Sequence, residues 1–74
     1  MNALEKFFIG QNDMNALEIL KEKGFSLEQH KKTAAGFTFK LIRFNKEMDV
    51  FQVITYNSDK TKTINKIELH HEEI

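Results

Sequence analysis

The stretch GFTFKLIRFNKEMDVFQVITY, from Gly36 to Tyr56, decides the fold. Apolar and polar residues alternate along 37–41, and again in part along 53–56, with the period of a half-buried β-strand. The polar residues Asn45-Lys46-Glu47 lie between these runs and are typical of a turn. The stretch therefore predicts two antiparallel strands joined as a hairpin.

A turn at Asn45-Lys46-Glu47 sets the register of this hairpin and hence its two faces. It places Phe44 opposite Met48, Leu41 opposite Phe51 and Phe39 opposite Val53. We expect one face to pack against helices, and it carries Phe37, Phe39, Leu41, Phe51 and Val53. The other face carries Thr38, Lys40, Ile42, Phe44, Val50, Gln52, Ile54 and Tyr56, and it is too apolar to be left to solvent alone.

Residues 1–24 are predicted to form a helical hairpin that covers the first of these faces. Leu4, Phe7 and Phe8 stand at helical spacing before Gly10, which is typical of a helix end. Asp13 is the expected N-cap of the second helix, which Gly24 ends. Its apolar stripe consists of Met14, Leu17 and Leu20, with Ala16 and Ile19 at its edges. We expect Leu17, Leu20, Phe39 and Phe51 to be buried where this helix meets the sheet.

The remaining segments give weaker signals. Residues 25–35 fit either a helix, starting with a capping box at Ser26 and Gln29, or an edge strand over 25–32 followed by a turn at Thr33-Ala34-Ala35-Gly36. The alternation of Phe25, Leu27 and Gln29 favours the strand. A turn is predicted at 57–60, a further strand over 61–69, and an unpaired acidic tail over 70–74.

These elements together predict an α+β fold in a single small domain over 1–74. An N-terminal helix pair (1–24) packs on one face of a three- to four-stranded antiparallel β-meander (25–69). The chain of 74 residues is short for one domain, so its core is small and its stability is expected to be marginal. The pentapeptide of residues 1–5 recurs at 14–18, but two short copies do not predict a repeat architecture.

Composition excludes several classes of function. The chain has no cysteine, which excludes disulfides and thiolate chemistry, and it has no apolar run of about 20 residues that would span a membrane. We therefore expect a cytoplasmic protein without membrane contact. His70 and His71 are adjacent and would point to opposite faces of a strand, so no metal site is predicted. No nucleophile–base pair or phosphate-binding loop stands out, so neither an enzyme nor a cofactor is expected.

The charges are unevenly distributed although eleven basic residues balance eleven acidic ones. Residues 1–30 carry a net charge of −2, residues 31–66 a net charge of +5 and residues 67–74 a net charge of −3. Basic side chains beside aromatic rings are typical of proteins that bind single-stranded nucleic acid. That alternative function would use Lys40, Arg43, Tyr56, Lys62 and Lys66.

Aliphatic side chains outnumber aromatic ones on the second face, and this favours a protein partner because aliphatic groups pack but do not stack on bases. The sequence thus predicts a small protein-binding adaptor or inhibitor, of the kind that phages and mobile elements encode. A homodimer through the same face is the other protein partner considered. The candidate binding residues are Lys40, Ile42, Arg43, Phe44, Val50, Ile54, Tyr56, Lys62 and Lys66.

Overall fold

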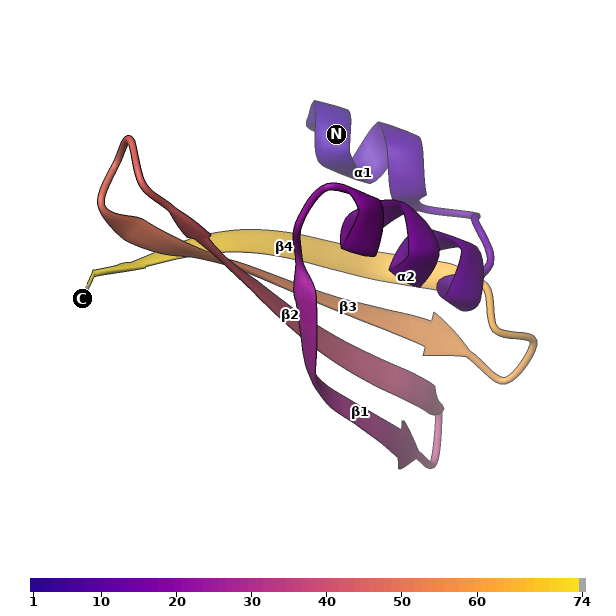
Figure 1. Cartoon of the computed structure of the whole chain (residues 1–74). Helices are drawn as coiled ribbons and strands as arrows, with labels where there is room; N and C mark the ends of the chain where they lie inside the picture. Colours follow the sequence, from indigo (N-terminus) through magenta and orange to yellow (C-terminus); the bar gives the residue numbers. More distant parts are fainter. Residues whose placement is uncertain (74) are drawn as a thin grey trace.

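A computed structural model describes residues 1–73 and shows two short helices followed by a four-stranded antiparallel sheet in the order β1-β2-β3-β4. Both helices lie on the same face of the sheet (Figure 1). The predicted α+β fold, a helix pair on a β-meander, is confirmed. Its elements are α1 (Ala3–Phe8), α2 (Asp13–Glu22), β1 (Ser26–Thr33), β2 (Gly36–Asn45), β3 (Val50–Asp59) and β4 (Ile64–Glu73).

Each helix begins at an asparagine cap. The side chain of Asn2 accepts a hydrogen bond from the backbone N–H of Glu5, whose carboxylate accepts one from Asn2 in return. At α2 the cap is Asn12, whose Oδ1 accepts from the N–H groups of the two residues at 14 and 15. The prediction of Asp13 as the N-cap is therefore wrong by one residue. Asp13 is instead the first helical residue, and its side chain is buried against the sheet.

Residues 26–33 form an edge strand and not a helix, as the alternation favoured. Every residue of β1 is exposed, in keeping with the polar sequence of this edge strand. Thr33 pairs with Gly36 across the two-residue turn Ala34-Ala35, at the predicted place. The Oγ1 of Thr33 accepts a hydrogen bond from the Gly36 N–H at 3.1 Å, which closes the hairpin.

The register of the β2–β3 hairpin differs from the prediction by three residues. The turn occupies residues 46–49, so that Leu41 lies opposite Ile54 and Phe39 opposite Tyr56. The Oδ1 of Asn45 accepts from the Met48 N–H at 3.1 Å and thereby stabilises this longer turn. Because three is an odd number, the shift exchanges the two faces of β3 while those of β2 stay as predicted.

The exchange corrects six predicted positions. Val50 and Gln52, predicted on the uncovered face, pair with Asn45 and Arg43 on the helix side. Ile54 and Tyr56, predicted on the uncovered face, are buried beneath the helices at 3% and 1% exposure. Phe51, predicted in the core, is only half-buried, and it pairs with Phe44 on the face away from the helices. Val53 shares that face opposite Ile42.

The β3–β4 connection also lies further along the chain than predicted. β3 continues to Asp59, whose Oδ1 accepts from the N–H groups of Thr61 and Thr63 and thereby orders the turn. β4 then runs to Glu73, which pairs with Val50. Residues 70–73 are therefore paired in the sheet, and the prediction of an unpaired tail is wrong for them; Ile74 lies outside the described residues.

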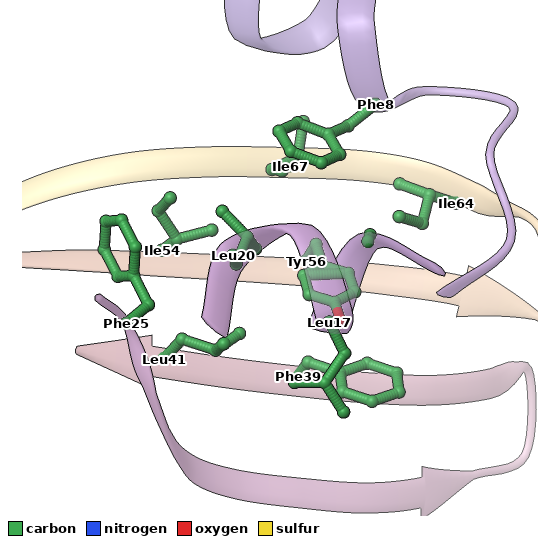
Figure 2. Packing of buried hydrophobic residues seen from close by; sticks show 11 residues of the cluster. Phe8, Leu17, Leu20, Phe25, Phe39, Leu41, Ile54, Tyr56, Ile64 and Ile67 are labelled. Carbon is green, nitrogen blue, oxygen red and sulfur yellow. The ribbon is translucent and has the colours of Figure 1, made fainter. Parts of the chain in front are cut away.

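The core lies between α2 and the centre of the sheet (Figure 2). Of the predicted stripe on α2, Leu17 and Leu20 are buried together with Ala16, whereas Met14 is 46% exposed. The Phe39 ring stacks on the Tyr56 ring with 4.5 Å between centroids. The buried apolar cluster is completed by Phe8, Phe25, Leu41, Ile54, Ile64 and Ile67.

Candidate interaction surface

The nine predicted binding residues do not form one surface. Ile54 and Tyr56 belong to the core, and Arg43 lies on the helix side, over the ring of Phe25. Val50 starts β3, and Lys62 lies in the β3–β4 turn with a positive φ of 65°. The other four lie on the sheet face turned away from the helices, here called the open face: Lys40, Ile42, Phe44 and Lys66.

An apolar patch lies on the open face near the β2–β3 turn. Phe44 and Phe51 are cross-strand partners whose rings meet edge to face, with centroids 5.2 Å apart. Phe44 is 39% exposed and Ile42 is half-buried beside them, whereas Val53 is fully covered. This part of the sheet extends beyond the helices (Figure 1). We call Ile42, Phe44 and Phe51 the hairpin patch.

Two lysines of the open face form ion pairs with glutamates. Lys40 lies 3.7 Å from Glu28, and Lys66 lies 3.2 Å from Glu68. Glu68 also lies 3.0 Å from the Nε2 of His70. The hydrogen bond and the charge of Lys66 hold the pKa of Glu68 below its ordinary value. These exposed pairs add little stability, but they offset the positive charge that the sequence places in this region.

A buried polar cluster lies beneath the N-terminus of α2. The Oγ of Ser58 donates to a carboxylate oxygen of Asp13 at 2.6 Å, and the Tyr56 hydroxyl donates to the Asp13 backbone carbonyl at 3.0 Å. Asp13 and Ser58 are 2% and 3% exposed. Asp13 lies in the first turn of α2, where the helix dipole favours a negative charge. The cluster joins α2 to β3 and explains why Asp13 is not the cap.

Tyr56 should stay un-ionised in alkaline solution. Burial, and next the Asp13 carboxylate, raise the pKa of its phenol above the ordinary value of 10.0. The un-ionised phenol contributes its full share of the free energy of unfolding below pH ~10, the pKa of the unfolded chain. This contribution is lost as the pH rises towards the folded-state pKa, because only the unfolded chain releases the proton readily.

Near-ultraviolet absorbance of tyrosinate measures this titration cleanly because Tyr56 is the chain's single tyrosine and there is no tryptophan. The same titration in denaturant is the control and should return an ordinary midpoint. Ionisation of Tyr56 near pH ~10 in the folded protein would contradict the buried position of its hydroxyl.

An apolar groove lies on the helix side, between α1 and the strands. Its volume is about 390 Å³, and its lining is almost entirely apolar. The guanidinium of Arg43 forms one end, where it donates to the Lys23 carbonyl at 2.6 Å and to the Gln52 side chain. The exposed side chains of Phe7 and Leu69 lie at its border. The groove requires α1 and β4 to meet, and no local sequence pattern indicates that contact.

The longer helix, α2, has ten residues, and no helix in the described part of the chain is long and apolar enough to cross a membrane. Within residues 1–73, no three histidine, aspartate or glutamate side chains gather into a metal-binding group. Comparisons with models of known families, with curated proteins and with solved structures find no match to this chain.

Proposed function

We propose that this chain is a small cytoplasmic protein-binding module that binds its partner through the hairpin patch. The observation that supports this most strongly is the Phe44–Phe51 pair, two rings held on a sheet face that no helix covers. Met48, 56% exposed at the adjacent turn, extends the apolar surface. Rigid aromatic side chains near the centre of a contact supply much of the binding free energy in protein interfaces.

A protein partner fits this surface better than nucleic acid does. Tyr56, the ring expected to stack on bases, is buried, and Arg43 is turned to the helix side. Lys40 and Lys66 each have a glutamate within 4 Å, so the open face lacks the excess of positive charge that attracts phosphates. The alternative of single-stranded RNA or DNA binding therefore loses its stacking ring, Tyr56, and its arginine, Arg43, from the open face.

The proposal includes no catalytic step. The polar side chains of the buried cluster, Asp13 and Ser58, lie beneath the N-terminus of α2 and bond to each other. A reacting group needs access to its substrate, and these atoms have none. Their contribution is to hold α2 against β3 on the face opposite the hairpin patch.

Affinity capture from the source cells tests the proposal. The tagged wild type should retain a specific protein after nuclease treatment, and Phe44→Ser should lose most of it because the patch then lacks its exposed ring. The matched control is Met14→Ser, which removes a comparably exposed apolar side chain from α2. Circular dichroism should show both variants folded. Equal capture by wild type and Phe44→Ser, or retention that nuclease abolishes, would contradict the proposal.

A further inference from the structure

Part of the β4 edge has no strand beside it in the described chain, since β4 is the last strand of the sheet. The start of this edge is occupied, because Ile64 exchanges backbone hydrogen bonds of 2.9 Å with Gly10 and Gln11. A bulge follows, where Ile64 pairs with Ser58 but Lys66 pairs with Asn57. Beyond it, residues 66–73 carry a row of outward N–H and C=O groups that can pair with another strand.

The charges along this strand alternate in sign on the open face. Lys66, Glu68 and His70 lie in a row, since Glu68 contacts both of the others at 3.2 and 3.0 Å. Glu72 follows at the same spacing of two residues and so shares their face. The order along the row is therefore basic, acidic, basic when protonated, acidic.

We propose that β4 pairs antiparallel with β4 of a second copy of this chain, with Leu69 opposite Leu69 at a two-fold axis. This register places Lys66 opposite Glu72 of the second copy and Glu68 opposite His70 of the second copy. The pairs occur twice because of the symmetry. The paired segment is 66–72, which starts just beyond the bulge that follows Ile64, the residue bonded to the Gly10–Gln11 loop. The two sheets become one continuous sheet.

Neighbouring registers do not match the charges in this way. Centring on residue 68 places Glu68 opposite its own copy, and centring on residue 70 places Glu68 opposite Glu72. Both bring like charges together, which is unfavourable across a pair of strands. Centring on Ile67 keeps opposite charges together but shortens the paired segment, because the backbone groups of Ile64 are already bonded to Gly10 and Gln11. The charge row therefore favours the register centred on Leu69.

The apolar side of β4 fits the same arrangement. Leu69 is 44% exposed beside the helix-side groove, and Phe7 of α1 is 56% exposed at the same border. The axis brings two Leu69 side chains together and removes apolar surface from water. The other edge strand, β1, is interrupted by a bulge near Glu28 and carries the adjacent Lys31 and Lys32, features that protect an edge from pairing. A β4–β4 contact also closes after two copies.

Charge exchange tests the dimer by sedimentation velocity. The wild type should form dimers, while Lys66→Glu or Glu72→Lys alone should weaken association about tenfold or more, since each creates two like-charge pairs. A mixture of the two single variants should recover dimers, because each supplies the charge that the other needs. A monomeric wild type, or failure of the mixture to associate, would overturn the proposal. Phe44→Ser should leave this dimer intact, which separates it from the hairpin patch.

An engineered cysteine tests the register, since the natural chain has none. Leu69→Cys should give a covalent dimer under mild oxidation, because directly opposite residues lie within the Cα distance that a disulfide spans. The control is His71→Cys, which lies opposite Ile67 of the second copy and is too far from its own copy to be linked. Linkage of His71→Cys equal to that of Leu69→Cys would overturn the register.

Discussion

Replacing Phe39 by alanine should lower the free energy of unfolding by about 3–5 kcal/mol, a large part of what so small a domain possesses. The Phe39 ring is 2% exposed and lies between two others, since it stacks on Tyr56 at 4.5 Å and on His30 at 4.2 Å. The substitution leaves a cavity between α2 and the sheet that the surrounding strands cannot close. Urea denaturation followed by circular dichroism measures the change.

Phe51→Ala is the matched control, because it makes the same chemical change in the neighbouring strand. Phe51 lies on the open face, half-buried against Phe44, so we expect a cost of about 1 kcal/mol. The sequence alone predicted that both rings are buried in the core, which implies similar losses for the two substitutions. Equal destabilisation of the two variants would therefore support the sequence-based register and contradict the one in the structure.

Several elements were predictable because their signals are local. Phe37–Leu41 alternates without interruption, and the faces of β2 follow from it. Leu17 and Leu20 have helical spacing, and both are buried in α2. The two-residue turn Ala34-Ala35 precedes a glycine at the closing position. In each case the residues that determine the structure lie within a few positions of one another.

The facing of β3 was not predictable in the same way. Val50, Phe51, Val53 and Ile54 include apolar residues in both phases of the strand, so periodicity does not select the buried face. The length of the β2–β3 turn decides it, and that turn includes Met48, an apolar residue that sequence reasoning assigned to a strand. An error in the length of the β2–β3 turn therefore exchanged the predicted positions of Tyr56 and Phe51 between core and surface.

The candidate surfaces depend on contacts between distant parts of the chain. The partner of Phe44 in the hairpin patch is set by the register and not by its neighbours in sequence. The end of the available β4 edge is set by the Gly10–Gln11 loop, more than fifty positions before Ile64. Such contacts have no local signature, although the alternating charges from Lys66 to Glu72 are visible in the sequence.

Gly36→Ala should be the most damaging substitution at a glycine, with a loss of more than about 3 kcal/mol. Gly36 has a φ of 151°, which side chains rarely adopt. A Cβ there would also press on the backbone of β3, against the Ser58 carbonyl oxygen and 2.8 Å from the Asp59 Cα. Backbone atoms cannot turn aside as a flexible side chain can, so either β2 or β3 has to move.

Neither strand can move without disturbing other contacts. Gly36 closes the β1–β2 hairpin with Thr33, and Ser58 is hydrogen-bonded to Asp13 beneath α2. Thermal unfolding of Gly36→Ala is compared with that of Gly10→Ala. Gly10 also has a positive φ, 93°, but a Cβ there meets nothing within 4 Å. The comparison therefore separates the cost of backbone strain from the cost of the steric clash with β3. Gly10→Ala should cost only about 1–2 kcal/mol. Equal losses at the two sites would show that backbone conformation alone, and not the contact between β2 and β3, requires glycine at position 36.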